Sequence, residues 1–264
     1  MKIIDFHTHI YPDKVASRTV RELKEVAGVG AATDGTLKDT GEKMKQWGVD
    51  AYVVLNVLTN PQRQNDAIDF CAAIKSGDRL PMCSIHPRTE DPEGAVRRIK
   101  KEGLYGVKFH PDYQGFFIDD EGMLEIYALL ERYALPAVFH MGFDPVSPEV
   151  IHGRPEAVKR IAGMFPRLKI VAAHLGGILC SDETLAHIAG LENVWLDTSM
   201  SEGYIEMGTA AKIIEAHGVE RVLFGSDCPW HDSPAEINFV KKLRLGEKAE
   251  ELIFGENAVK LLGL

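Results

Sequence analysis

Eight short apolar runs recur along the 264 residues of the chain. They lie at residues 3–7, 51–56, 81–85, 106–109, 137–140, 169–174, 194–197 and 222–225. Most of their residues are β-branched or aromatic, which is typical of parallel strands that are buried on both faces. The longer stretches between the runs carry helical, amphipathic patterns. Eight strands that alternate with helices predict an α/β fold in which a parallel sheet closes into a (βα)8 TIM barrel.

The length of the chain agrees with this fold. A barrel of this kind typically has about 250 residues, so we expect residues 1–264 to form a single domain. The alternative is an open, doubly wound sheet, which would need a glycine-rich phosphate-binding turn after an early strand. Residues 7–12 (HTHIYP) follow the first run and contain no glycine. The closed barrel is therefore the fold that the sequence favours.

Composition narrows the class of protein. The 30 lysines and arginines are outnumbered by 39 aspartates and glutamates, a net charge of −9 that argues against binding to nucleic acid. The four cysteines are scattered and form no C-x-x-C pair, as is typical of reduced thiols in the cytosol. No run approaches the roughly 20 apolar residues of a membrane-spanning helix, and the N-terminus has no signal-peptide stretch. We expect a cytoplasmic protein that binds neither nucleic acid nor membranes.

Residues that can bind a metal ion stand at the ends of four of the runs. The first run ends at His7, and His9 follows two positions later, so both imidazoles should point to one face of the strand. His140 and His174 end the fifth and sixth runs, and Asp227 follows the eighth. Since the carboxyl ends of barrel strands form one mouth, where active sites lie, we expect these side chains to converge there.

This set of residue types suits hydrolytic metal chemistry. Three neutral imidazoles from His7, His9 and His140 and the carboxylate of Asp227 would form a ligand shell for one divalent ion with a position open to water. Zinc is the first expectation, and manganese, iron or cobalt could occupy similar ligands. The ion would activate a water molecule. We expect Asp227 to accept the proton of that water, and His174 to orient it or to stabilise charge on the substrate.

The motifs resemble those of the amidohydrolase superfamily, specifically its amidohydrolase-related branch, also called amidohydrolase 2. The matching pieces are IDFHTH at residues 4–9, FH at 139–140, AHLGG at 173–177, FGSDCPW at 224–230 and GENAVKLL at 255–262. The resemblance covers essentially the whole chain. It implies a barrel with one catalytic metal ion bound by His7, His9, His140 and Asp227, with His174 acting beside it.

The fourth run departs from many members of that superfamily, which hold a second metal ion through a carboxylated lysine or a glutamate there. Here the segment reads GVKFHP at residues 106–111. We interpret Lys108 as an ammonium group that binds an anionic part of the substrate, together with His110 on the same strand face. A second metal ion is not expected, although a carbamate on Lys108 would allow one, and a solvated lysine at a strand end is the plainer alternative. Trp230 is expected to form a wall of the substrate site.

Two further expectations concern the surroundings of the mouth. Asp5 lies one step below His7 on the expected ligand face, where it would either orient a ligand or be an ordinary buried, hydrogen-bonded aspartate. Substrate specificity should come from the loops after the strands, notably residues 11–36, 113–119 and 141–154. Loop sequence does not define the shape of a pocket, so the substrate stays open at this point.

Three functions fit the sequence. The first is a metal-dependent hydrolase that cleaves an ester, lactone or amide bond of a small, anionic substrate. The second is a metal-dependent, non-oxidative decarboxylase of an aromatic or unsaturated carboxylic acid, because the branch includes such enzymes with the same ligands. The third is a catalytically silent metal-binding barrel. The expected partner is a small-molecule substrate, and a homodimer is the default assembly for such a barrel.

Overall fold

The computed structural model describes residues 2–264. Within them, eight parallel strands form one sheet, in which each strand pairs with the next along the chain. The strands are β1 (Ile4–Thr8), β2 (Ala51–Leu55), β3 (Arg79–Ser84), β4 (Val107–Phe109), β5 (Ala137–Phe139), β6 (Ile170–Ala172), β7 (Val194–Asp197) and β8 (Val222–Leu223). All eight predicted runs are strands in the structure, with ends that shift by no more than two residues.

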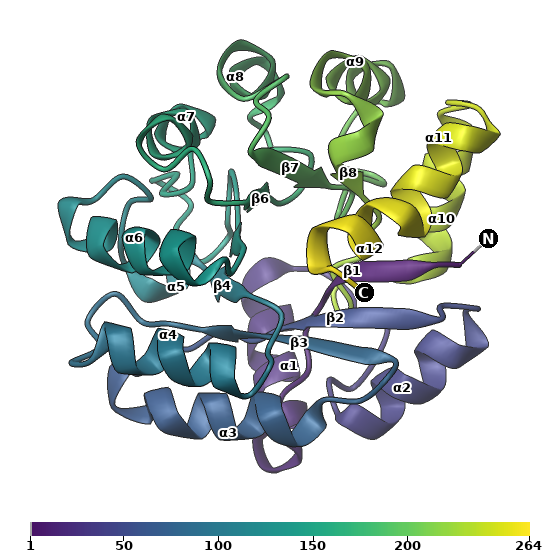
Figure 1. The fold of residues 1–264 in the computed structure, drawn as a ribbon. Coiled ribbons are helices and arrows are strands. Elements are labelled where there is room, and N and C mark those ends of the chain that lie inside the picture. The colour runs from purple at the N-terminus through teal and green to yellow at the C-terminus, as the bar shows by residue number, and fades with distance from the viewer. Residues whose placement is uncertain (1) are drawn as a thin grey trace.

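Helices surround the ring of strands (Figure 1). They are α1 (Asp13–Ala27), α2 (Leu37–Gln46), α3 (Gln64–Ile74), α4 (Pro92–Lys101), α5 (Pro111–Gln114), α6 (Leu124–Tyr133), α7 (Pro155–Met164), α8 (Ser181–His187), α9 (Met207–His217), α10 (Ser233–Lys242), α11 (Glu247–Glu251) and α12 (Asn257–Leu262). The last helix, α12, lies over the amino ends of the strands, where Ala258 and Leu261 join the cluster inside the ring. This helix closes the end of the barrel opposite the mouth.

Hydrogen bonds between β1 and the segment of β8 close the ring. The amide of Phe6 donates to the carbonyl of Phe224 at 2.7 Å, and the amide of His9 donates to the carbonyl of Cys228 at 2.6 Å. The amide of Asp227 donates to the carbonyl of His7 at 2.8 Å. The predicted (βα)8 barrel is confirmed. Its closure places His7 and Asp227 side by side, although they are 220 positions apart in the chain.

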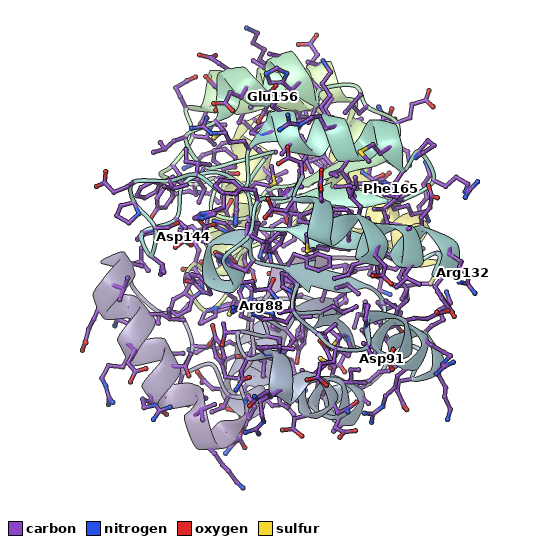
Figure 2. All side chains as sticks on the ribbon, turned by 90° about the vertical axis from the view of Figure 1, so that its left-hand side faces the viewer. Arg88, Asp91, Arg132, Asp144, Glu156 and Phe165 are labelled. Carbon is purple, nitrogen blue, oxygen red and sulfur yellow. The ribbon has the colours of Figure 1, made fainter. Side chains whose placement is uncertain are left out.

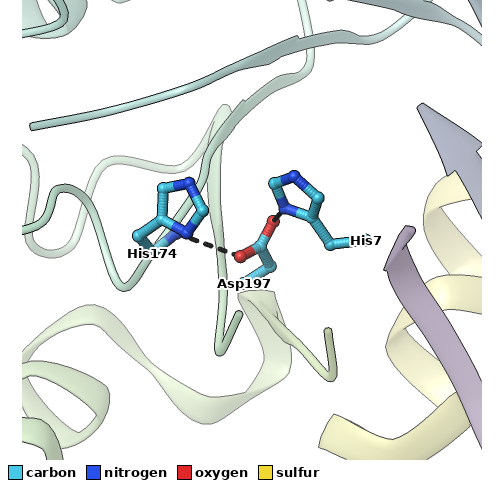
Figure 3. Close-up of side chains that lie close together, drawn as sticks. All are labelled: His7, His174 and Asp197. Carbon is cyan, nitrogen blue, oxygen red and sulfur yellow. Dashed lines mark hydrogen bonds and ion pairs between the residues drawn. The ribbon is translucent and has the colours of Figure 1, made fainter. Parts of the chain in front are cut away.

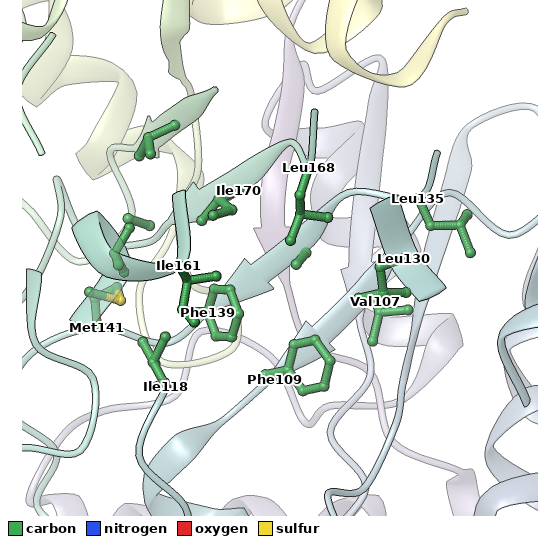
Figure 4. Packing of buried hydrophobic residues seen from close by; sticks show 14 of the residues in the cluster. Val107, Phe109, Ile118, Leu130, Leu135, Phe139, Met141, Ile161, Leu168 and Ile170 are labelled. Carbon is green, nitrogen blue, oxygen red and sulfur yellow. The ribbon is translucent and has the colours of Figure 1, made fainter. Parts of the chain in front are cut away.

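Side-chain alternation along β4 decides where Lys108 lies. Its neighbours Val107 and Phe109 pack outward against the surrounding helices, beside Phe139 of β5 and Leu130 of α6 (Figure 4). Because successive side chains of a strand face opposite sides, Lys108 points into the barrel, and it is fully buried there. The alternative interpretation, a solvated lysine at a strand end, is therefore wrong.

The same alternation fails on β1. Ile4 and Phe6 belong to the cluster inside the ring, whereas the carboxylate of Asp5 accepts a hydrogen bond from Ser233 of the outer helix α10 at 2.8 Å. The register of β1 against β2 shifts between Asp5 and Thr8. His7 therefore faces the barrel interior although Asp5 faces away from it, so our expectation of one shared face for these two residues is wrong.

The connection between β1 and β2 also differs from expectation. Residues 11–36 are not simply a loop, because α1 occupies Asp13–Ala27 and ends at Gly28, whose φ of 67° is in the left-handed region that suits glycine. Its buried residues are Ala16 and Val20 alone among fifteen. This helix is thus attached to the barrel less tightly than a helix such as α4, which buries three of ten.

None of the helices within residues 2–264 combines the length and the apolar character needed to cross a membrane.

Candidate metal centre and active site

Three of the predicted ligands meet at the mouth of the barrel. The Nε2 atoms of His7 and His9 lie 3.2 and 3.1 Å from the same carboxylate oxygen, Oδ1 of Asp227. All three side chains are buried. Asp227 has a φ of 73° and lies four positions after Leu223, the last residue of β8. Its side chain is held beside the end of β1 by the hydrogen bonds that close the ring.

Hydrogen bonds at Nδ1 fix the tautomers of the two rings. The Nδ1–H of His9 donates to the carbonyl of Leu55 at 2.8 Å, and the Nδ1–H of His7 donates to the carboxylate of Asp197 at 2.8 Å. Burial and the charge of Lys108 lower the pKa of His7 to about 4, so the ring is neutral. Each Nε2 therefore presents a lone pair towards the carboxylate.

This arrangement fits a divalent cation. Each Nε2 lies within 3.2 Å of the carboxylate oxygen, and the three donor atoms lie within 4.8 Å of one another in a buried site. Burial alone would raise the pKa of Asp227, but positive charge on the rings of His7 and His9 lowers it below its ordinary value. A divalent cation between these groups would supply the same positive charge while both rings stay neutral. Neutral imidazoles and an ionised carboxylate are the forms in which these side chains bind metal.

Asp197 at the end of β7 links the ring of His7 to the backbone of His174 (Figure 3). One of its oxygens accepts from His7, and the other accepts from the backbone amide of His174 at 3.0 Å and from the hydroxyl of Ser199. Burial alone would raise the pKa of Asp197, but the neighbouring imidazole of His7 lowers it below its ordinary value. A buried carboxylate that holds the Nδ1–H of a metal-binding histidine is a common way to orient the ligand.

Sequence reasoning missed Asp197. The seventh predicted run ends at this residue, just as the first, fifth and sixth runs end at the histidines that we did select. The position at a strand end was therefore a usable signal. Asp5, which we considered for the same orienting role, instead accepts from the backbone amides of His7 at 3.1 Å and Ser226 at 3.0 Å. It holds the backbone of both strand ends rather than an imidazole.

His174 and His140 form a chain of hydrogen bonds with defined direction. The Nδ1–H of His174 donates to the carbonyl of Ser199 at 3.1 Å, which leaves its Nε2 to accept from Nδ1–H of His140 at 3.0 Å. Burial lowers the pKa of both rings below the ordinary value. The Nε2 of His140 then carries a free lone pair, and it is buried with no hydrogen-bond partner within residues 2–264.

His140 lies in a second group, next to the first. Its Nε2 and the Nε2 of His110 are each 3.6 Å from a carboxylate oxygen of Asp144. The rings of His110 and His140 stack with centroids 4.2 Å apart, and Tyr113 stacks on the other side of His110 at 3.6 Å. The structure thus unites His7, His9 and Asp227 in one compact group of donor atoms and places the fourth predicted ligand in a neighbouring group.

Lys108 lies between the two groups. Its Nζ is 3.2 Å from the Nε2 of His7, and burial lowers its pKa to about 8. A cavity of about 640 Å³ opens beside it and is lined by Lys108, His110, His140, Asp227 and Trp230 among others. Every residue that we predicted to bind substrate therefore lines this cavity.

The fold and the site together define a buried centre of histidines and aspartates at the mouth of a (βα)8 barrel, with a substrate-sized cavity beside it. The family model described as amidohydrolase matches residues 4–264. The chain belongs to this family, as the sequence motifs predicted, and it is a metal-dependent enzyme of that family. Among curated proteins, none matches the sequence.

Solved structures agree on the fold. An uncharacterised TIM-barrel protein, Bb4693 from Bordetella bronchiseptica, is 21% identical with a TM-score of 0.75, over 100% of this chain and 99% of that one. A dihydroxybenzoic acid decarboxylase from Polaromonas sp. JS666, with bound manganese and the inhibitor 2-nitroresorcinol, is 16% identical with a TM-score of 0.71, over 100% and 97%. A probable 2-pyrone-4,6-dicarboxylic acid hydrolase from Acinetobacter baumannii, with citric acid bound, is 16% identical with a TM-score of 0.68, over 100% of both chains.

Proposed function

We propose that the protein is a metal-dependent hydrolase that cleaves an ester, lactone or amide bond of a small, anionic substrate. The observation that carries this proposal is the buried group of His7, His9 and Asp227, whose lone pairs converge next to an open cavity. These residues and the unpartnered Nε2 of His140 would hold one divalent ion, with zinc as the proposed metal. The ion would polarise the bond to be cleaved and lower the pKa of water at the site.

The protein's own residues supply the remaining steps. Asp227, ionised and buried, would accept the proton of the attacking water. His174 would stabilise developing negative charge by taking up a proton at Nε2, the atom that here accepts the hydrogen bond from His140, while the carbonyl of Ser199 holds its Nδ1–H. Lys108 and His110 would bind the anionic group of the substrate, and Trp230 would form a wall beside it.

Lys108 is the side chain that indicates an anionic substrate. A buried ammonium group is stabilised by neighbouring negative charge, and a substrate carboxylate in the cavity would supply it. In Lys108→Met, we expect the KM for an anionic substrate to rise by about 10-fold or more, while kcat changes less. An equal loss with an uncharged substrate of the same shape would contradict this role.

Decarboxylation is the second candidate. Its support is that several solved structures with this fold are decarboxylases of dihydroxybenzoates and related acids. In that case the same centre would bind the carboxylate and a neighbouring oxygen of the substrate, and a ring carbon would be protonated as carbon dioxide leaves. Against it, the arginine that lines the cavity, Arg63, belongs to the short 3-10 helix Pro61–Arg63 that precedes α3 rather than to a strand end.

One experiment separates these candidates. The purified protein is analysed for metal content, reconstituted in parallel with zinc, manganese, iron and cobalt, and assayed on panels of lactones, esters, amides and 2-hydroxy aromatic acids. We expect about one equivalent of metal and hydrolysis that is absent in Asp227→Asn. Carbon dioxide release from the acids, abolished in His174→Ala, would make the protein a decarboxylase. Failure to bind any metal would leave a silent barrel.

A further inference from the structure

The cavity beside the metal centre continues well beyond the residues that carry the chemistry. Its volume is about 640 Å³. It lies within the range of pockets that enclose drug-sized ligands. A single six-membered ring with its substituents would leave much of this space unfilled.

One long wall of the cavity is α1. Four of its residues line the cavity at successive intervals of four positions: Val15, Thr19, Leu23 and Ala27. Residues at this spacing share one face of a helix, and at a rise of about 1.5 Å per residue they extend over about 18 Å. Opposite them lie Val57 and Leu58 after β2 and Phe70 of α3. The cavity is therefore an apolar channel between α1 and α3.

The channel starts at the reacting end. Only three residues separate His9 from Asp13, the first residue of α1, so Val15 lies near the mouth and Ala27 lies farthest from it. In Figure 2, α1 is the pale purple helix that stands out from the body of the molecule, below the loop that carries Asp144. The polar groups of the centre occupy one end of the cavity, and mainly apolar side chains line the path along α1 away from them, with the charged residues Glu22, Arg63 and Asp66 also on its walls.

The lining face of α1 is left unpacked by the protein itself. Val15, Thr19, Leu23 and Ala27 are only half-buried, although an apolar helix face normally packs against its barrel. An apolar ligand in the channel would cover this face and gain about 25 cal/mol for each Å² of apolar surface removed from water. The unfilled face and the continuity with the metal centre both point to an elongated ligand.

We propose that the substrate is an elongated molecule, with a polar, anionic head at the metal centre and an extended apolar tail along α1 and α3. This inference rests on the proposed site but not on the type of bond that it breaks. Leu23 at the middle of the channel is then a specificity-determining residue, because its side chain sets the space available to the tail.

The test measures binding rather than turnover. Straight-chain carboxylates from butanoate to dodecanoate are titrated calorimetrically into the metal-loaded, full-length protein. We expect the Kd to fall by up to about fourfold for each added methylene, until the chain fills the channel and the gain stops. No binding, or equal affinity for all chain lengths, would overturn the proposal.

A pair of matched variants places the tail on α1. Leu23→Trp puts an indole into the channel, whereas Val26→Trp puts the same group on the exposed face of the helix, where Val26 is 54% exposed. We expect Leu23→Trp to weaken decanoate binding at least 10-fold with little change for butanoate, and Val26→Trp to bind both as the parent protein does. Equal losses in both variants would show that the tail does not follow this channel.

The outcome is separable from that of the hydrolase assay. Chain-length-dependent binding without hydrolysis of any ester would keep the elongated substrate and reject the hydrolase. Hydrolysis with the same kcat/KM for acetate and decanoate esters would keep the hydrolase and reject the elongated substrate.

Discussion

The two sides of the barrel mouth are built from the same residue types but are organised differently. On the β1–β8 side, the Nδ1 atoms of His7 and His9 are held by Asp197 and by the carbonyl of Leu55, so each Nε2 is aimed at Asp227. On the β4–β5 side, the rings of His110 and His140 stack on each other and approach Asp144 no closer than 3.6 Å.

The difference lies in what each side leaves unsatisfied. Nδ1 of His110 and Nε2 of His140 are buried without hydrogen-bond partners within residues 2–264, and such an atom typically costs about 1–3 kcal/mol. A cost of this kind persists where a ligand later supplies the missing partner. We infer that the β1–β8 side is organised in advance for the metal ion, whereas the β4–β5 side is completed by the ion and the substrate together.

Asp227→Asn gives the strongest test of the β1–β8 side. The change removes the negative charge that the two imidazoles face, and leaves the shape almost unchanged. We expect loss of bound metal and a fall in kcat/KM of at least about 10³-fold. Metal analysis after dialysis and steady-state kinetics would measure both. A variant that keeps a full equivalent of metal would place the ion elsewhere, with the β4–β5 group as the next candidate.

His174→Ala tests the residue that connects the two sides. His174 accepts a hydrogen bond from His140 and is held by Ser199, but it does not belong to the group formed by His7, His9 and Asp227. We therefore expect a loss of about 10²- to 10⁴-fold in kcat, as for a group that assists proton transfer or charge stabilisation, with metal content unchanged. A drop in metal content equal to that of Asp227→Asn would make His174 a ligand instead.

The barrel itself could be predicted from sequence because its signal is repeated. Eight apolar runs of the right length each carried the same information, so an error of two residues at the end of one run changes nothing in the topology. The candidate ligands could be selected for the same reason. His7, His140 and His174 each stand at a strand end, and closure of the ring brings strand ends together wherever they lie in the chain.

What could not be predicted depended on single local events. The irregularity of β1 turns Asp5 outward, and no periodic pattern reports a shift of register within a five-residue strand. Asp197 has the orienting position that we considered for Asp5, because its carboxylate accepts the hydrogen bond from Nδ1–H of His7. The helix α1 was missed although its sequence is amphipathic, because we took the whole stretch from residue 11 to residue 36 as a loop after the first strand.

Asp197→Asn tests whether orientation in advance contributes to metal binding. An amide in place of the carboxylate would weaken the hydrogen bond to Nδ1–H of His7, and could turn an N–H towards the ring. We expect metal affinity to fall by about 10- to 100-fold, measured by competition with a chelator. Asp5→Asn is the matched control, since it changes a buried aspartate that holds backbone amides and the hydroxyl of Ser233 but no imidazole. The control should lower thermal stability and leave metal affinity within about twofold, and equal losses of affinity would contradict the assignment.

Asp144→Asn should have the smallest effect, because Asp144 belongs to the side that is completed by the ligand. Its carboxylate lies 3.6 Å from the Nε2 atoms of His110 and His140, so the change removes a charge without breaking a close hydrogen bond to either ring. We expect metal content to stay at the parent level and KM to change by less than about 10-fold. If the variant instead lost its metal, the β4–β5 group would be part of the prepared metal centre, and the two sides of the mouth would not differ in the way that we infer.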